Sequence, residues 1–277
     1  MKYILMTVAA LTVAFGLGFL VTGLIRRKIK RKPPMWAHIL IAICISLLVI
    51  CVGSFGYLSI HYPAQDEAVA VFSDQNDAQT FEIEGGYFVD GRGEDTALVF
   101  YQGAKVDAEA YLPLMKRLAE NGVDCFLLKT PFDMPIFDSN AADNIIGKYD
   151  YDTFLLGGHS MGGLVASGYA AQHSDAVDGV VLLAAYPTEK ISDSVGLLSV
   201  YGTDDKVLDR GAYESAKRYF PDGYTEKIIN GGNHAQFGNY GAQSGDGEAK
   251  ITAQEQQTQT AFAIIQFAEE IKKGFCF

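Results

Sequence analysis

Two long apolar segments fill most of the first 60 residues, and they constrain this chain more than any other feature. Residues 3–25 and residues 36–60 contain no Asp, Glu, Lys or Arg. Crossing the hydrocarbon core of a bilayer takes about 20 residues of helix, and each segment is longer than that. We therefore predict two transmembrane helices, with the bilayer as the partner of residues 3–60.

The alternatives are a cleaved signal peptide for the first segment and a buried core helix for either segment, and the sequence between the segments argues against the signal peptide. A signal peptide has an apolar region of about 7–15 residues that ends at a small-residue cleavage site. Here the first segment leads directly into RRKIKRKPP at residues 26–34, which is typical of a stop-transfer sequence. Short basic loops stay in the cytoplasm. We therefore predict an integral plasma-membrane protein with a basic cytoplasmic loop at 26–35 and everything after residue 62 on the outer face.

Charge separates the two parts of the chain as sharply as hydropathy does. Residues 1–60 hold seven of the 22 basic residues and none of the 33 acidic ones, so residues 61–277 hold 15 basic and 33 acidic residues, a net charge of −18. So acidic a region repels the phosphate backbone of DNA or RNA. We exclude nucleic acid as a partner and divide the chain into a membrane part, 1–62, and one soluble domain, 63–277.

The soluble domain shows short apolar segments that alternate with helical patterns. Segments at 68–72, 80–86 and 87–91 alternate in hydropathy and end in turn residues, as antiparallel strands do. Nearly continuous Val/Leu/Ile runs with helical patterns between them indicate a mostly parallel sheet with helices on both faces. We expect strands at 97–101, 124–129, 153–158, 179–186, 197–202 and 224–230, and helices at 108–120, 141–147, 161–172, 210–219 and 253–272. In such sheets the functional residues follow the carboxyl ends of the strands.

The strongest chemical signal is GHSMG at residues 158–162, between a predicted strand and a predicted helix. A tight strand-to-helix turn of this kind exposes a serine hydroxyl, and glycine is needed where a side chain would clash. The N-terminus of the following helix favours negative charge that develops near the serine. We therefore predict that Ser160 is a nucleophile. A structural serine in a glycine-rich turn is the alternative.

A serine nucleophile needs a base and an acid that orients the base. Of the five histidines, only His234 follows the last predicted strand and satisfies the chain order Ser–Asp–His. The acid should follow the strand at 197–202, where Asp204 and Asp205 are both candidates. Asp209 lies too far along the chain, and the spacing alone does not choose between the two neighbours.

These motifs together resemble the α/β-hydrolase superfamily, in particular its small cap-less serine esterases and dienelactone-hydrolase-like members. The resemblance covers about residues 68–273 and rests on GHSMGG, YGTDDKV and GGNHAQFG. It implies an α/β-hydrolase fold, places the acid at Asp205 counting from Gly202, and implies an oxyanion hole made by the N–H groups of Ala104 and Met161. The chain departs from dienelactone hydrolases in having Ser rather than Cys as nucleophile. It also has Gln102-Gly103 where many relatives have His-Gly.

The expected function is hydrolysis of a small-molecule carboxylic ester by a Ser160–His234–Asp205 triad, without cofactor or metal. Only residues 187–196 separate two consecutive predicted strands, too few for a helical lid. We therefore expect an open site, bordered by 131–137, 187–196 and the loop after His234, and a preference for short or compact acyl groups. The alternatives are a lipid esterase or acyltransferase at the membrane surface, and a non-catalytic membrane-anchored binding protein. The sequence does not indicate an oligomeric state.

Overall fold

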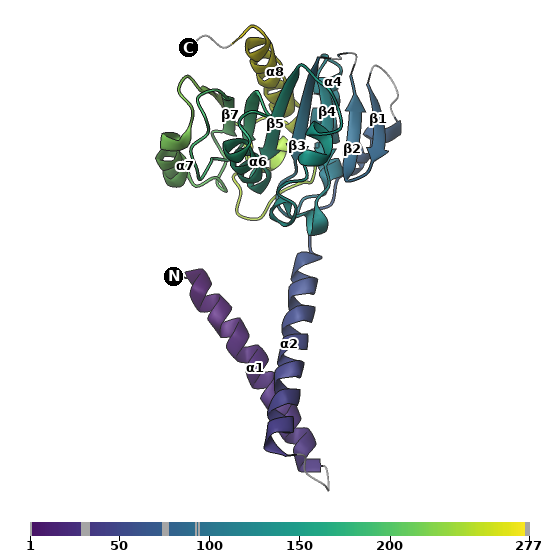
Figure 1. Ribbon diagram of the computed structural model, residues 1–277, viewed down its shortest axis with the longest axis vertical. Coiled ribbons are helices and arrows are strands. Elements are labelled where there is room, and N and C mark those ends of the chain that lie inside the picture. The colour runs from purple at the N-terminus through teal and green to yellow at the C-terminus, as the bar shows by residue number, and fades with distance from the viewer. Residues whose placement is uncertain (1, 29–33, 74–77, 92, 94, 275–277) are drawn as a thin grey trace. The chain divides into compact units, whose positions relative to one another are not determined.

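A computed structural model describes residues 2–28, 34–73, 78–91, 93 and 95–274, with side chains from residue 11 onward. The chain divides into two compact units, Met1–Ile60 and His61–Phe277. Figure 1 shows both units in ribbon form.

The first unit consists of α1 (Lys2–Lys28) and α2 (Met35–Leu58). The two helices approach closely at Gly18, where an added Cβ would lie 2.6 Å from the carbonyl oxygen of Ala42 and 2.2 Å from Ser46 Oγ. Ala42 and Ser46 are fully buried. Small residues permit such contacts between apolar helices, in membranes above all.

Only α2, among the described residues, is both long and apolar enough to cross a membrane, with a mean hydropathy of 2.8 in its most apolar window. The predicted span at 36–60 therefore has a matching helix. The predicted span at 3–25 does form a helix, but its membrane crossing stays a prediction. The orientation also stays a prediction, and residues 29–33 of the basic loop lie outside the described residues.

In the second unit the described strands form one eight-stranded sheet in the order β1-β2-β4-β3-β5-β6-β7-β8. Both pairings of β2, with β1 and with β4, are antiparallel, and every other pairing is parallel. The predicted mostly parallel sheet is thus confirmed. The strands are β1 (Gln79–Ile83), β2 (Gly86–Asp90), β3 (Thr96–Tyr101), β4 (Asp124–Leu128), β5 (Thr153–His159), β6 (Gly179–Leu183), β7 (Gly196–Gly202) and β8 (Thr225–Ile229).

The predicted strand at 68–72 is wrong. That segment forms α3 (Asp66–Val69) and a 3-10 turn, η1 (Ala70–Ser73). Asp66 and Glu67 occupy the first turn, where acidic residues stabilise a helix by opposing its dipole. Ala68 is fully buried while Val69 is 47% exposed. The alternation of hydropathy therefore reflects one buried residue on a short helix and not the two faces of a strand.

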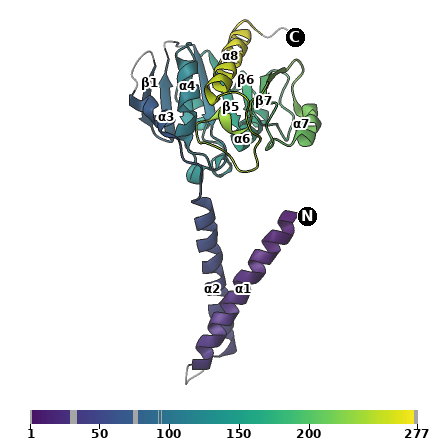
Figure 2. The ribbon, with the colours of Figure 1, turned by 180° about the vertical axis from the view of Figure 1, so that it is seen from behind.

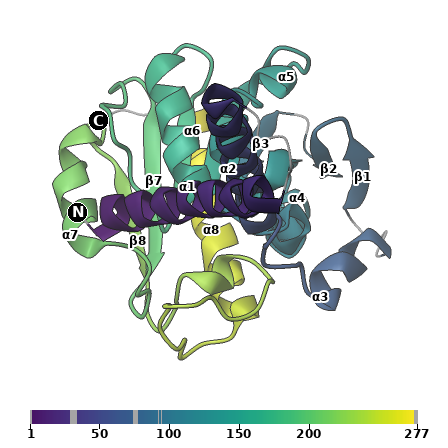
Figure 3. The same cartoon turned by 90° about the horizontal axis from the view of Figure 1, so that it is seen from below.

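Helices cover both faces of the sheet, with α6 and α7 on one face (Figure 1) and α4 and α8 on the other (Figure 2). Figure 3 shows α6 and α8 on opposite sides of the strands. Successive side chains of β3 serve the two layers in turn: Val99 packs in the core beneath α6, and Leu98 in the core beneath α4 and α8. The helices are α4 (Leu112–Ala119), α5 (Asp143–Ile146), α6 (Met161–Gln172), α7 (Arg210–Ala216) and α8 (Ala253–Lys272), with 3-10 turns η2 (Ala108–Tyr111), η3 (Pro131–Asp133), η4 (Pro135–Phe137), η5 (Lys217–Tyr219) and η6 (Ala235–Phe237).

The connection between β6 and β7 contains no helix: residues 184–195, all of them described, form only turns and irregular backbone. The predicted absence of a lid insertion at this place is confirmed. The carboxyl ends of β5, β6 and β7 are therefore not covered by an inserted helical cap.

Candidate active site

Ser160 lies at the sharp turn between β5 and α6. Its backbone has φ +53° and ψ −117°, a conformation that side chains rarely adopt. The turn is held because the Ser160 N–H donates to the carbonyl of Leu183 on β6, at 2.9 Å. Glycine is required on both sides of the serine. A Cβ at Gly158 would lie 2.3 Å from the carbonyl carbon of Gly162, and one at Gly162 would lie 2.3 Å from the carbonyl oxygen of Gln102.

The structure brings Asp205 and His234 together, although they lie on different loops. His234 Nδ1 is 2.8 Å from Asp205 Oδ2, and the two residues are 1% and 4% exposed. The other carboxylate oxygen, Oδ1, accepts the N–H groups of Val207 and Leu208, each at 2.8 Å. Burial alone would raise the pKa of Asp205, but the hydrogen bonds from His234 and from these two N–H groups lower it. An ionised Asp205 accepts a hydrogen bond from the Nδ1–H group of His234, which leaves Nε2 of His234 as the free base.

Asp204, the neighbouring candidate, is held elsewhere. Its Oδ1 lies 2.8 Å from Lys250 Nζ, and its Oδ2 accepts the hydroxyl of Thr203 at 3.1 Å. The two adjacent carboxylates therefore have separate partners, one the imidazole and the other a lysine. Asp209, set aside on sequence grounds, accepts the N–H of Ala212 and caps α7.

The loop that carries His234 is fixed to the start of α8. Gln256 accepts the N–H of Asn233 at 3.0 Å and donates to the Asn233 carbonyl at 2.8 Å. The N–H of Ala235, on the other side of the histidine, donates to Asp246 at 2.9 Å. Bonds on both sides of His234 hold its ring in place before any ligand arrives.

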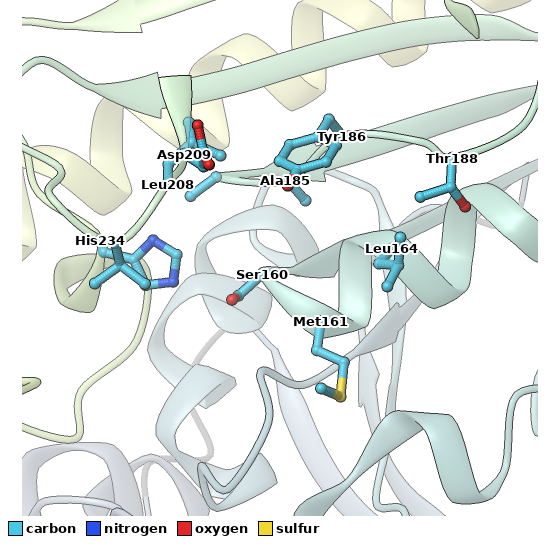
Figure 4. A pocket seen from close by; sticks show the side chains of 11 residues that line it. Ser160, Met161, Leu164, Ala185, Tyr186, Thr188, Leu208, Asp209 and His234 are labelled. Carbon is cyan, nitrogen blue, oxygen red and sulfur yellow. The ribbon is translucent and has the colours of Figure 1, made fainter. Parts of the chain in front are cut away.

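Ser160 and His234 face one another across the site, with the hydroxyl directed towards the imidazole (Figure 4). Within the described part of the chain His234 Nε2 is buried and makes no hydrogen bond. The bond between a nucleophile and its base is often long before substrate binds. The arrangement leaves the base nitrogen available to the serine hydroxyl.

The two predicted oxyanion donors begin the segments after β3 and after the nucleophile. In the described residues, neither the N–H of Ala104 nor that of Met161 donates a hydrogen bond to another group of the chain. Gln102, which precedes this loop, is fully buried, and its carboxamide makes no hydrogen bond in the same part of the chain. Both N–H groups are thus available to an external acceptor.

A cavity of about 320 Å³ opens beside Ser160 and His234. Ligand pockets commonly measure about 300–1,000 Å³, so this one is at the small end. Predicted segment 187–196 contributes Thr188, but segment 131–137 does not line the cavity, contrary to expectation. The lining comprises Ser160, Met161, Leu164, Ala184, Ala185, Tyr186, Thr188, Val207, Leu208, Asp209 and His234.

Residues 97–258 match the model of the alpha/beta hydrolase family, which covers more than half of the chain. The chain belongs to the α/β-hydrolase family. No curated protein matches it.

Solved structures agree on the fold of this α/β-hydrolase. A soluble variant of monoglyceride lipase from Saccharomyces cerevisiae is 13% identical, with a TM-score of 0.51 over 70% of this chain and 94% of the lipase. A bacterial heroin esterase is 15% identical, with a TM-score of 0.51 over 73% and 89%. Epoxide hydrolase A from Mycobacterium thermoresistibile is 12% identical, with a TM-score of 0.51 over 69% and 98%. Such low identities show the shared fold and not a shared substrate.

A buried pair next to Ser160, the predicted nucleophile of this α/β-hydrolase, was not predicted from the sequence. His159, 1% exposed, has its Nδ1 2.8 Å from the hydroxyl of Tyr111, which in turn accepts the N–H of Gly103 at 3.0 Å. The His159 and His234 rings lie 4.5 Å apart between centroids. Burial, with the neighbouring His234 as a smaller cause, lowers the pKa of His159 well below its usual value. The pair links the Ser160 turn to the Ala104 loop, and only the position of His159 next to Ser160 hinted at it.

One group outside the active site has the composition of a metal site. The ligand atoms of His61, Asp107 and Asp133 lie within 4.8 Å of one another. His61 Nε2 is 3.2 Å from Asp107 Oδ1, so a direct contact already joins two of the three. Sequence spacing could not reveal this group, because its members come from three separate segments.

Proposed function

We propose that this α/β-hydrolase is a membrane-anchored serine hydrolase that cleaves carboxylic esters. The observation that carries the proposal is the buried 2.8 Å contact between His234 and Asp205, opposite the Ser160 hydroxyl and next to a cavity. A nucleophile, a base and an orienting acid in that order are what acyl transfer through serine requires.

In the proposed reaction Ser160 Oγ attacks the acyl carbon, and His234 Nε2 takes the hydroxyl proton. The N–H groups of Ala104 and Met161 stabilise the oxyanion that forms. The bond to the leaving alcohol then breaks, and His234 protonates the alcohol oxygen, which leaves an acyl-enzyme. Water attacks the acyl-enzyme, His234 takes a proton from the water and returns it to Ser160, and the acid is released. Asp205 stays ionised and stabilises the imidazolium in both steps.

Active-site labelling tests the proposal. The full-length protein in mild detergent should react with a fluorophosphonate probe, because the probe captures an activated serine. Ser160→Ala should lose the label, whereas Ser167→Ala, a serine of α6 whose hydroxyl bonds to Leu164, should keep it. A folded wild-type protein that takes no label would favour the non-catalytic binding protein.

The membrane part of the proposal rests on the apolar segments and the basic loop 26–35. We propose that α1 and α2 both span the plasma membrane, with the hydrolase domain outside. Protease added to intact cells should then digest the domain, and a cysteine introduced in the loop should be shielded from impermeant reagents. A protected domain with a labelled loop would reverse the orientation. A mature N-terminus after residue 25 would identify the first segment as a signal peptide.

An exposed apolar group on the domain favours a second candidate, a lipid esterase at the membrane surface. Phe132, Ile136 and Phe137 are 45%, 56% and 53% exposed. Exposed aromatic and aliphatic side chains of this kind favour a water–lipid interface. Replacing all three by Ser should reduce hydrolysis of esters in vesicles and spare soluble esters if this candidate is correct.

A further inference from the structure

The charge that lines the active-site cavity has one sign. Asp209 is the only acidic group among the eleven lining residues, and these residues include no lysine or arginine. The surrounding domain carries a net charge of −18, from 15 basic and 33 acidic residues after residue 60. The potential in the cavity is therefore negative, and low-dielectric walls concentrate such a field.

Two basic residues of the adjoining loops, Lys190 and Arg210, are engaged elsewhere, and the charge of Lys206 acts on Asp204. Lys190 Nζ lies 2.9 Å from Asp193 Oδ1 and donates to the carbonyl of Phe220 at 2.9 Å. The guanidinium of Arg210 lies 3.8 Å from the centre of the Tyr201 ring and donates to the Gly202 carbonyl. Neither side chain forms an ion pair with Asp209.

The structural task of Asp209 does not require its charge. Asp209 Oδ1 accepts the N–H of Ala212 at 2.9 Å and so caps α7. Asn and Ser cap helices about as well as Asp does. A substitution at Asp209 can therefore remove the negative charge at the cavity without removing the cap of α7.

Asp209 lies on the same wall of the cavity as Tyr186, with Met161 on the opposite wall (Figure 4). A carboxylate and an aromatic ring that line one cavity both attract positive charge. We propose that Asp209 makes this site select esters that carry an ammonium group over neutral esters, and neutral esters over anionic ones. The inference rests on the proposed function, since it concerns substrates of Ser160.

Three esters of one acyl group and matched size test the selection. Their alcohol parts end in trimethylammonium, in tert-butyl or in carboxylate. At low ionic strength the full-length protein in uncharged detergent should rank kcat/KM in that order, with steps of about fivefold, because one partly screened charge pair contributes roughly that factor. Salt at about 0.5 M should lower both kcat/KM ratios, because it screens the charge of Asp209.

Asp209→Asn should lower the kcat/KM ratio of ammonium to neutral ester, and that of neutral to anionic ester, to about one to two, because it removes the charge and keeps the helix cap. Glu214→Gln serves as the control. It changes the net charge equally, but Glu214 lies on α7 outside the cavity and pairs with Lys217 at 3.1 Å. The control should keep the wild-type ranking. If circular dichroism shows that Asp209→Asn is unfolded, Asp209→Ser is used in its place, because serine is also a neutral helix cap.

The outcomes separate this inference from the proposed function. Wild-type protein that hydrolyses all three esters with equal kcat/KM would overturn the charge selection and leave the hydrolase proposal intact. A ranking unchanged in Asp209→Asn would do the same, since another source would then supply the field. Failure to hydrolyse any ester, with Ser160 unlabelled by fluorophosphonate, would overturn both proposals.

Discussion

The two sides of the proposed active site differ in how many of their polar groups already have a partner before substrate binds. On the acid–base side, formed by the loops after β7 and β8, His234 and Asp205 are almost inaccessible to water, and both carboxylate oxygens are bonded. On the nucleophile side, formed by the Ser160 turn and the loop after β3, the N–H groups of Ala104 and Met161 remain unused within the described chain.

The difference indicates a division of labour. Groups that handle protons gain from a dry, fixed setting, because a buried charge pair is strong and needs no rearrangement during reaction. Groups that contact substrate must stay available to an external partner. The acid–base side is therefore complete in the folded chain, and the nucleophile side is completed only by substrate.

Removing the nucleophile should have the largest effect. Ser160→Ala should lower kcat for ester hydrolysis by about 10⁴- to 10⁶-fold, and His234→Ala should cost about as much, because triad members act as a unit. Initial rates on a soluble ester, with the folded state checked by circular dichroism, measure both. A His234→Ala variant with more than a tenth of wild-type activity would show that the two sides do not work together.

Asp205→Asn should have the next largest effect, about 10³- to 10⁴-fold in kcat, because an amide no longer stabilises the imidazolium and favours the wrong tautomer. Asp204→Asn should change kcat less than about threefold, since it loses only an ion pair with an exposed lysine. The two variants change neighbouring residues in the same way. The opposite order of effects would move the acid to Asp204.

The sequence predicted most of the elements that position the site, because their patterns are local. Mostly apolar runs located β3 to β7, and the glycine-rich turn located α6 at 161–172. The wrong strand at 68–72 came from a segment of five residues, too short for alternation to separate strand from helix.

The cavity walls were harder to predict, because loops that are distant in sequence form them. Residues 131–137 were expected at the site, and residues 207–209 line it instead. The link from His159 through Tyr111 to Gly103, and the group formed by His61, Asp107 and Asp133, were also missed. Nothing in sequence spacing brings these side chains together.

His159 tests how far the dry region extends, because it lies on the nucleophile side and yet is buried. Its folded-state pKa is well below the unfolded value of about 6.5. Below that pH the unfolded chain binds a proton that the folded chain does not, so stability falls as pH falls, by up to about 1.4 kcal/mol per pH unit. Thermal unfolding of the full-length protein between pH 4.5 and 7.5 should show this slope.

His159→Gln should flatten that slope, since glutamine does not titrate. His173→Gln is the control: His173 is the C-cap of α6, it is partly exposed, and the slope should persist. If the pH dependence of stability is unchanged in His159→Gln, water reaches the His159 ring in the folded protein. The dry region would then end at His234.

Acyl chain length should have the smallest effect, and it tests how open the nucleophile side is. No lid covers this side between β6 and β7, and the cavity measures about 320 Å³, so it accommodates a compact acyl group and leaves a long chain in water. Each methylene that is buried contributes about 0.8 kcal/mol, up to about fourfold in kcat/KM, and each that stays in water contributes nothing. We therefore expect kcat/KM to rise over the first few carbons of a C2 to C16 series and then to level or fall, with no increase when micelles form.

A steady rise to C12–C16 that steepens in micelles would show that apolar surface beyond the cavity, such as Phe132, Ile136 and Phe137, completes the binding site. The nucleophile side would then be closed by lipid, and the lipid-esterase candidate would replace the short-acyl one.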